Sequence, residues 1–286
     1  MNGNATIADV LDGRARWCVV ERDALAVLAE LPAGCVDAVV TDPPYSSGGM
    51  FRGDRTLSTR AKYVQSGATE GAAECPEFTG DGRDQRSFCY WCALWMAEAL
   101  RVAVPGGVLA TFADWRQLPI MSDAVQCGGW IWRGIVPWSK PGARPSSGRF
   151  TSQCEYVVWA TSGPRSGEAI GGRCLPGFYE AGFLRGDDRE HIAQKPVDIL
   201  RNLVQIAPER GVVLDPFAGS GTTGVAAVIE NRRAICCELV PEHAAIARAR
   251  IAAAEAGTDY RRPQQGGLFD RPTRQEARPN ADNAPL

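Results

Sequence analysis

Apolar positions near the start of the chain recur first at helical spacing and then in an unbroken run. Leu25, Leu28 and Leu31 lie three residues apart, which places them on one face of a helix. The run over residues 36–40 is short and rich in valine, as in a strand that is buried on both faces. With a strand expected from Trp17, this segment predicts a strand, a helix and a second strand.

The same alternation resumes after a long polar stretch. Ser87 is expected to cap a helix that carries Trp91 and Trp95 on its apolar face. Pro105, Gly106 and Gly107 are expected to form a turn before a buried strand over residues 108–112. The next expected elements are a helix near 115–126 and strands near 130–136 and 156–160.

The last third of the chain repeats helix and strand in strict order. The expected elements are a helix at 196–206, a strand at 212–214, a helix at 222–230, a strand at 234–237 and a helix at 242–256. This order is typical of a mostly parallel α/β sheet with helices on both faces, a Rossmann-like fold.

The distribution of polar residues divides the chain into one domain, two interruptions and a tail. Residues 1–256 form the expected domain. Residues 46–86 are rich in Gly, Ser, Thr and charge and are predicted to be a mobile loop, and residues 141–190 are predicted to be an insertion. Residues 257–286 are polar and aperiodic, so they are expected to be a disordered tail.

Composition narrows the class of protein. The 286 residues are 45% hydrophobic but contain no apolar stretch long enough to span a membrane and no signal peptide at the start, so a cytoplasmic protein without membrane contact is expected. The ten cysteines are scattered, which favours reduced thiols. Cys89 and Cys92 have the spacing of a zinc site, but there is no second pair and only two histidines, so no metal is expected.

A glycine-rich turn marks the candidate cofactor loop. Gly219, Gly221 and Gly224 have the GxGxxG spacing between a strand and a helix, and Glu238 ends the next expected strand. An acid in that place can accept hydrogen bonds from both hydroxyls of a ribose. The motif alone does not separate a nicotinamide dinucleotide from S-adenosylmethionine. Asp215 favours the latter, because a carboxylate before the glycines repels pyrophosphate and attracts an amino group.

The tetrapeptide Asp42-Pro43-Pro44-Tyr45 follows a buried strand, where open α/β sheets bind ligands. An exocyclic amino group of a base is a poor nucleophile unless acceptors hold its hydrogens. Asp42 is one acceptor, and the rigid carbonyl of Pro43 is a second, because consecutive prolines fix the backbone. Tyr45 supplies an aromatic face on which an extruded base can stack.

These motifs together resemble those of the amino-group-specific DNA methyltransferases of the beta arrangement, in which the catalytic motif precedes the cofactor loop. TDPPY at 41–45 matches the catalytic motif, LDPFAGSGTT at 214–223 the cofactor loop, and HIAQKP at 191–196 the segment before that loop. The Pro-Gly-Gly turn before the strand at 108 also fits this family.

The resemblance implies an enzyme that transfers a methyl group from S-adenosylmethionine to an amino nitrogen of a flipped base. The implied catalytic residues are Asp42, Pro43, Pro44 and Tyr45, and the implied cofactor-binding residues are Asp215, Phe217, Ala218, Gly219, Gly221, Thr222, Glu238 and Lys195, with the lysine on the methionine side. An Asp-first tetrapeptide favours adenine N6 over cytosine N4. An S-adenosylmethionine enzyme acting on RNA or protein, a dehydrogenase and a DNA-binding module without activity remain the alternatives.

The implied partner is double-stranded DNA. The net charge of −2 means that any DNA contact must be local, and residues 131–173 carry six basic residues against two acids. Arg144 and Arg149 within this stretch are the candidate DNA contacts, and the insertion at 141–190 is the candidate target-recognition region. In the tail, Gln265, Leu268 and Phe269 have the spacing of peptides that dock on a bacterial sliding clamp.

Overall fold

The computed structural model describes residues 5–46, 82–143, 145, 147, 148, 150–182 and 195–261. These residues contain an eight-stranded sheet in the order β1-β8-β7-β2-β3-β5-β4-β6. The strands are β1 (Trp17–Glu21), β2 (Val36–Thr41), β3 (Ala103–Ala113), β4 (Ile131–Ser139), β5 (Cys154–Thr161), β6 (Tyr179–Glu180), β7 (Val212–Asp215) and β8 (Arg233–Glu238).

The sheet is mostly parallel. Strands β1, β8, β7, β2 and β3 pair in parallel, whereas β5 runs antiparallel to both β3 and β4. The short β6 pairs in parallel with the end of β4. Because β2 pairs with β7, the N-terminal and C-terminal halves of the chain meet in the middle of the sheet.

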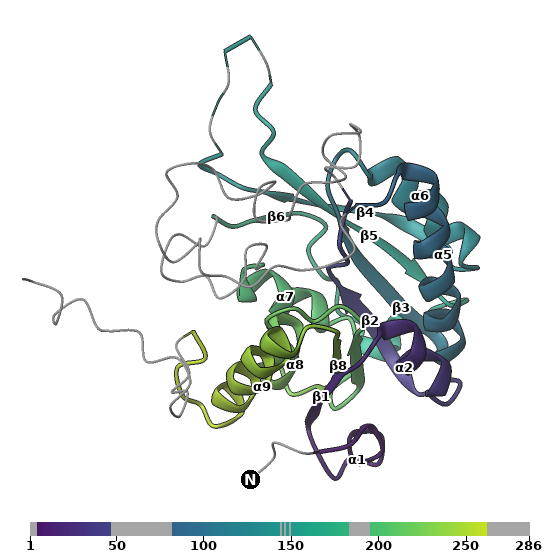
Figure 1. The fold of residues 1–286 in the computed structure, drawn as a ribbon, viewed down its shortest axis with the longest axis vertical. Helices are drawn as coiled ribbons and strands as arrows, with labels where there is room; N and C mark the ends of the chain where they lie inside the picture. Colours follow the sequence, from purple (N-terminus) through teal and green to yellow (C-terminus); the bar gives the residue numbers. More distant parts are fainter. Residues whose placement is uncertain are drawn as a thin grey trace, which may run out of the picture.

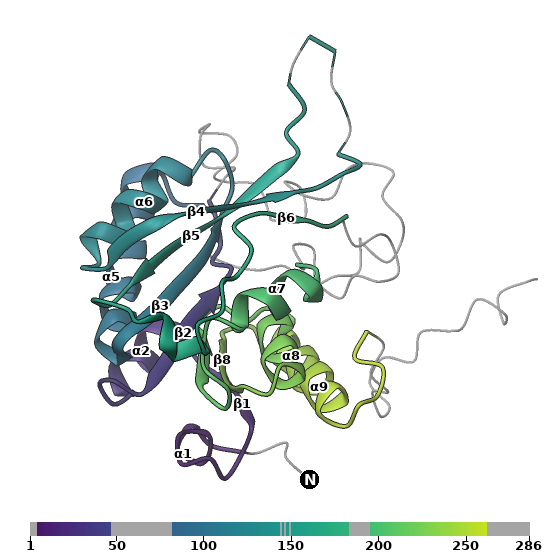
Figure 2. The same ribbon diagram turned by 180° about the vertical axis from the view of Figure 1, so that it is seen from behind.

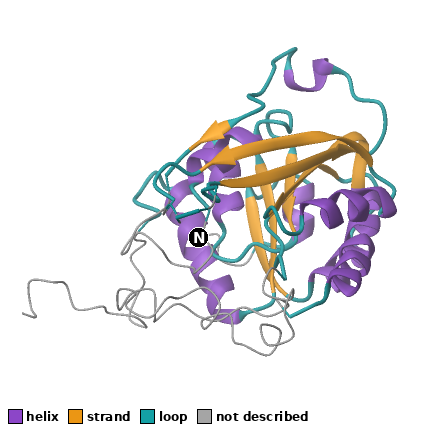
Figure 3. Cartoon of the chain, turned by 90° about the horizontal axis from the view of Figure 1, so that it is seen from above, coloured by secondary structure: helices purple, strands orange, loops and turns teal. Residues whose placement is uncertain are grey.

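Helices cover both faces of the sheet, as the α/β pattern predicts (Figures 1 and 2). One face carries α1 (Ile7–Leu11), α2 (Ala24–Glu30), α5 (Gln85–Val102) and α6 (Leu118–Cys127), and the other carries α7 (Val197–Val204), α8 (Thr222–Ile229) and α9 (Pro241–Glu255). The view from above shows the strands between the two helical layers (Figure 3). A short 3₁₀ turn, Gly167–Ile170, follows β5.

The apolar run in β2 explains why this strand lies inside the molecule. Val36 and Val39 pack in the core under α2 and α5, whereas Ala38 and Val40 pack in the core under α7 and α8. All four are fully buried. Burial of a valine side chain contributes roughly 1.5 to 3 kcal/mol to the stability of the fold, so β2 is held firmly in the sheet. The tetrapeptide 42–45 follows directly after this strand.

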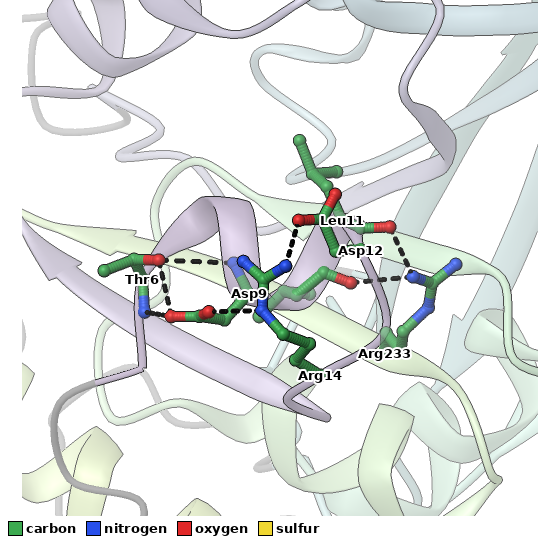
Figure 4. Close-up of polar contacts among 7 residues, drawn as sticks. Thr6, Asp9, Leu11, Asp12, Arg14 and Arg233 are labelled. Carbon is green, nitrogen blue, oxygen red and sulfur yellow. Dashed lines mark hydrogen bonds and ion pairs between the residues drawn. The ribbon is translucent and has the colours of Figure 1, made fainter.

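Helix α1, which the pattern did not predict, depends on side-chain contacts (Figure 4). Thr6 and Asp9 form a capping box, in which each side chain accepts a hydrogen bond from the other residue's backbone N–H. Arg14 donates to Asp9 at 2.9 Å, and Arg233 donates to the last two carbonyls of the helix. A five-residue helix is not stable alone, so these contacts hold it.

Two expected boundaries were wrong. The N-cap of α5 is Asp84, whose carboxylate accepts from the N–H of Ser87, so Ser87 lies inside the helix that it was expected to cap. The residues Pro105, Gly106 and Gly107 lie within β3 and form an irregularity in its pairing with β2, with a φ of 74° at Gly106. Gly106 has the left-handed conformation that turns often use, but a bulge within a strand uses it as readily.

The expected insertion at residues 141–190 contains part of the sheet itself. Strand β5 lies between β3 and β4 and is buried along most of its length. Among the described residues of this range, those of β5 and the two residues of β6 belong to the sheet.

Candidate active site

The ends of β2 and β7 lie side by side at the carboxyl edge of the sheet. The two strands pair in parallel, with residues 38–39 opposite residues 213–214. Beyond this register, the Thr41 hydroxyl donates a hydrogen bond of 2.6 Å to Oδ1 of Asp215. The tetrapeptide 42–45 and the glycine loop, which are distant in sequence, therefore start from neighbouring positions.

The glycine loop turns tightly against α9. Gly219 and Gly221 have φ values of 52° and 79°, a region that glycine enters without steric cost. A Cβ on Gly221 would lie 2.8 Å from Cβ and 2.9 Å from Cα of Ala247. Helix α8 begins at Thr222, directly after this turn. The loop therefore has the strand, turn and helix context that the sequence predicts.

Glu238, at the end of β8, contacts the glycine loop directly. Its Oε2 accepts from the N–H of Gly219 at 2.8 Å, and its Oε1 accepts from the N–H of Val240 at 2.9 Å. Burial raises the pKa of Glu238, while these backbone hydrogen bonds oppose the rise. The structure therefore places this carboxylate at the loop. The sequence predicted that it binds the hydroxyls of a ribose.

Asp215 is a buried acid at the start of the same loop. Its Oδ1 accepts from the Thr41 hydroxyl and, at 3.1 Å, from the N–H of Phe217. Burial raises its pKa to about 6, although hydrogen bonds from Thr223 and Thr41 lower it. The hydrogen bonds within the protein thus compensate only part of the cost of burying the Asp215 carboxylate.

Aromatic residues of α5 enclose Phe217. The ring centroids of Trp91 and Trp95 lie 5.2 and 5.3 Å from that of Phe217. Such tilted and edge-on pairs contribute about 0.5 to 1.5 kcal/mol each. The sequence placed both tryptophans on the apolar face of a helix but gave no reason to connect them with the loop, because the connection depends on how α5 lies on the sheet.

A buried arginine ties the loop to α9. Arg250, which is 1% exposed, donates to the carbonyl of Ser220 at 2.6 Å and to its hydroxyl at 2.8 Å. It also donates to the hydroxyl of Thr222 at 3.2 Å. The sequence gave no signal for this role, since an arginine on a helix is usually solvated.

Asp42 has two unlike carboxylate oxygens. Its Oδ2 accepts from the ammonium of Lys195 at 2.6 Å. Its Oδ1 is buried and accepts no hydrogen bond from the residues that the structure describes. Burial raises the pKa of Asp42, Lys195 lowers it, and Glu155 raises it further. A buried acceptor without a donor is costly, so Oδ1 is suited to receive an N–H from a ligand.

The tyrosine of the tetrapeptide lies beside the same charges. The Tyr45 hydroxyl donates to Oε2 of Glu155 at 3.3 Å, and the ammonium of Lys195 lies 5.0 Å from the centre of the Tyr45 ring. Burial, together with Asp42 and Glu155, raises the pKa of Tyr45 well above its usual value. Tyr45 therefore stays a neutral aromatic group next to Asp42.

Glu155 and Lys140 complete a buried network that sequence reasoning did not identify. Glu155, on β5, accepts from Lys140 at 2.5 Å through Oε1, and its Oε2 lies 3.3 Å from the ammonium of Lys195. These lysines hold the pKa of Glu155 below its usual value even though burial raises it. The one signal in the sequence was that Glu155 is a charged residue near the start of an otherwise apolar strand. The structure also places Lys195 on Asp42, whereas the sequence assigned it to the methionine side.

Several predicted features lie outside the described residues. They are the candidate DNA contacts Arg144 and Arg149, most of the loop at 46–86, the sliding-clamp motif at 265–269 and nearly all of the tail. Within the described ranges no three His, Cys, Asp or Glu side chains are grouped as metal ligands. No helix in those ranges has the length and apolar character needed to cross a membrane.

Comparison with known proteins places the chain among DNA methylases. Residues 36–249 match the model of the N6/N4 methyltransferase family, described as DNA methylase. This range includes both the tetrapeptide and the glycine loop. A protein of Escherichia coli (strain K12) named as methylase YubD is 26% identical over 253 residues, covering 88% of this chain and 95% of the relative.

Two solved structures show the same fold. TTHA0409 of Thermus thermophilus, named as a DNA modification methylase and solved in complex with S-adenosyl-L-methionine, has a TM-score of 0.58 and 23% identity. It covers 85% of this chain and 97% of its own. The PvuII DNA methyltransferase, described as cytosine-N4-specific, has a TM-score of 0.61 and 15% identity and covers 89% of each chain.

Proposed function

Because the chain belongs to the N6/N4 family of DNA methylases, we propose that it transfers a methyl group from S-adenosylmethionine to N6 of adenine in double-stranded DNA. The observation that carries the proposal is the contact between Thr41 and Asp215, which brings the tetrapeptide to the edge of the glycine loop. The proposed cofactor needs the residues of the glycine loop, and the target base needs those of the tetrapeptide, so the two segments must lie side by side.

The loop fits the proposed cofactor. Gly221 has no room for a side chain because Ala247 of α9 lies against it, so the turn stays tight at the start of α8. Glu238 at this turn is able to accept from ribose hydroxyls, and the buried Asp215 is able to pair with the amino group of the methionine part. The structure of TTHA0409 in complex with S-adenosyl-L-methionine supports the same assignment. When bound, this cofactor supplies an electrophilic methyl group.

The tetrapeptide fits an exocyclic amino group. In the proposed complex, Oδ1 of Asp42 and the carbonyl of Pro43 each accept a hydrogen bond from one N–H of the target amino group. These two hydrogen bonds direct the lone pair of the nitrogen toward the methyl group. The methyl group would pass from the sulfonium to this nitrogen with the neutral thioether as leaving group, and Oδ1 of Asp42 would take the proton that the amino group gives up and release it to solvent. The base must leave the duplex, which costs a few kcal/mol, and stacking on Tyr45 offsets part of that cost.

The choice of adenine rests on the tetrapeptide. Its first residue is Asp42, which the resemblance associates with adenine rather than cytosine. Cytosine N4 is the second candidate, and the similarity of the fold to the cytosine-N4-specific PvuII enzyme favours it. Both bases present an amino group to the same two acceptors, so the product decides between them.

Mass spectrometry of nucleosides tests the function. DNA from a methylation-deficient host that expresses the chain should contain N6-methyladenine. Asp42→Ala should lower this signal at least about 1,000-fold, because both the acceptor and its orientation are lost, while affinity for S-adenosylmethionine stays within about 3-fold. A signal of N4-methylcytosine alone overturns the adenine assignment. Absence of any methylated base with the wild-type chain, tested also in vitro on the same DNA, overturns the function.

A further inference from the structure

Lys195, Glu155 and Lys140 form a network of charges around Asp42. The binding of an amino group by Asp42 does not by itself require these three residues. We propose, on the basis of the proposed function, that Lys195 and Glu155 are a positioning pair: Glu155 fixes the Lys195 ammonium on Oδ2 of Asp42, so that Asp42 stays ionised and its Oδ1 remains the acceptor for the target amino group.

The contacts support a directed role for Lys195. Its ammonium is 2.6 Å from Oδ2 of Asp42 and 3.3 Å from Oε2 of Glu155. It also lies 5.0 and 5.3 Å from the ring centres of Tyr45 and Phe112. Two carboxylates and two aromatic faces thus fix a side chain that is only 8% exposed. A free lysine has several rotatable bonds, so this confinement determines where its charge lies.

The charge balance explains why the pair is stable in a buried place. Asp42 and Glu155 contribute two negative charges, and Lys195 and Lys140 contribute two positive charges. Burial of unpaired carboxylates favours their protonation, and a protonated Asp42 is a poorer acceptor for an amino N–H. Lys195 opposes that protonation directly, and Lys140 keeps Glu155 ionised so that Glu155 continues to hold Lys195.

The electrostatic effects of the pair on Asp42 have opposite signs. Lys195 lowers the pKa of Asp42, whereas Glu155 raises it. The titratable groups that face Asp42 are Lys195, Glu155, Tyr45 and Asp215. Tyr45 stays neutral in the neutral pH range and lowers the pKa of Asp42 only through a hydrogen bond. Lys195 and Glu155 are therefore the charges that set the pKa of Asp42, and with it the acid limb of the rate profile, the low-pH range in which the rate falls. Removal of Lys195 should move this limb to higher pH, and removal of the Glu155 charge should move it to lower pH.

Single-turnover methyl transfer between pH 5 and 9 tests the pair. The full-length chain is used with radiolabelled S-adenosylmethionine and DNA from a methylation-deficient host. Lys195→Gln should raise the midpoint of the acid limb by about 1 pH unit or more and lower the rate at pH 7 at least about 10-fold. Glu155→Gln should lower the midpoint by about 0.5 unit and lower the plateau rate about 5-fold, because Lys195 loses its second anchor.

Arg201→Gln is the matched control. Arg201 lies on α7, soon after Lys195 in the chain, and its guanidinium pairs with Glu230 at 2.7 Å. This variant loses the same charge and a contact of similar length, but away from Asp42, so its midpoint should stay within about 0.2 unit of wild type. Lys195→Arg, which keeps the charge, should restore most of the wild-type midpoint and confirms that the charge is what acts.

Three results overturn the positioning pair while leaving the proposed function intact. The first is a uniform loss of rate in both Gln variants without a shift of the midpoint. The second is a midpoint that moves to lower pH in Lys195→Gln, since removal of a nearby positive charge can only raise the pKa of Asp42 if the ammonium acts on it. The third is loss of S-adenosylmethionine affinity in Lys195→Gln by more than about 10-fold with an unchanged midpoint, which would assign the lysine to the cofactor. A wild-type chain that methylates no DNA at any pH would instead refute the proposed function.

Discussion

The two sides of the candidate site differ in the kind of contact that builds them. On the cofactor side, formed by the glycine loop, Glu238 and Arg250, most contacts involve the backbone and small side chains. On the catalytic side, formed by the tetrapeptide with Lys195, Glu155 and Lys140, the contacts join charged side chains. The first side is shaped by steric fit and the second by electrostatics.

This difference predicts two separable types of variant. Backbone turns and close packing are part of the folded core, so changes that crowd the glycine loop should lower stability and cofactor affinity together. Charges around Asp42 set protonation and orientation, so changes on the catalytic side should alter the pH dependence of the rate at nearly constant affinity. A variant that violates this division would show that the two sides are coupled.

Gly221→Ala should have the largest effect on the cofactor side. A side chain at its φ of 79° costs about 1 to 2 kcal/mol, and contact with Ala247 at 2.8 Å adds about 1 to 3 kcal/mol. The free energy of unfolding should therefore fall by about 2 to 5 kcal/mol, and S-adenosylmethionine affinity at least about 100-fold. Urea denaturation and calorimetry measure these quantities.

Gly34→Ala is the control for backbone strain without crowding. Gly34 has a φ of 64°, and a Cβ added there would have no atom within 4 Å, so this variant should lose only about 1 to 2 kcal/mol and no cofactor affinity. Equal stability losses in both alanine variants, with cofactor binding retained, would contradict a turn that is limited by close approach to Ala247.

The local geometry of the glycine loop was predictable from the sequence, whereas the charged contacts around Asp42 were not. Gly219, Gly221 and Glu238 form a local pattern whose spacing follows from one strand, one turn and the next strand. Glu155 meets Asp42 only because β5 lies antiparallel between β3 and β4, with Glu155 opposite Trp138. Strand order is a property of the whole sheet, and a single sequence contains no direct measure of it.

The same reasoning explains the errors in the predicted elements. The alternation of apolar runs gave the major helices and strands, because each has its own periodicity. Helix α1 was missed because five residues carry too short a pattern, and its stability comes from Thr6, Asp9 and Arg233. The antiparallel direction of β5 was not predicted, since buried strands of either direction have the same apolar run.

Asp215→Asn should have an effect of intermediate size and opposite sign on stability. The pKa of Asp215 is raised from 3.8 to about 6, mainly by burial, so its ionised form destabilises the folded chain above that pH. A shift of about two units corresponds to about 3 kcal/mol at most. The Asn variant should be more stable than wild type at pH 8, and this advantage should shrink as the pH falls from about 6 toward 4.

Urea denaturation at pH 8, 6 and 4.5 measures the effect on stability, and calorimetry measures cofactor affinity at pH 8. We expect affinity for S-adenosylmethionine to fall about 10-fold or more, because the variant lacks the carboxylate that we propose to pair with the amino group of the methionine part. A variant that is less stable than wild type at pH 8 would show that the hydrogen bonds from Thr41 and Phe217 outweigh the cost of burying the charge.

Tyr45→Phe should have the smallest effect and separates the ring of Tyr45 from its hydroxyl. The hydroxyl donates to Glu155 at 3.3 Å, a long hydrogen bond whose loss should cost less than about 1 kcal/mol, or about 5-fold in rate. Tyr45→Ala removes the stacking surface as well and should lower the rate about 100-fold. If instead Phe is as harmful as Ala in single-turnover assays, the hydroxyl belongs to the charge network, and electrostatics governs base binding as well as the state of Asp42.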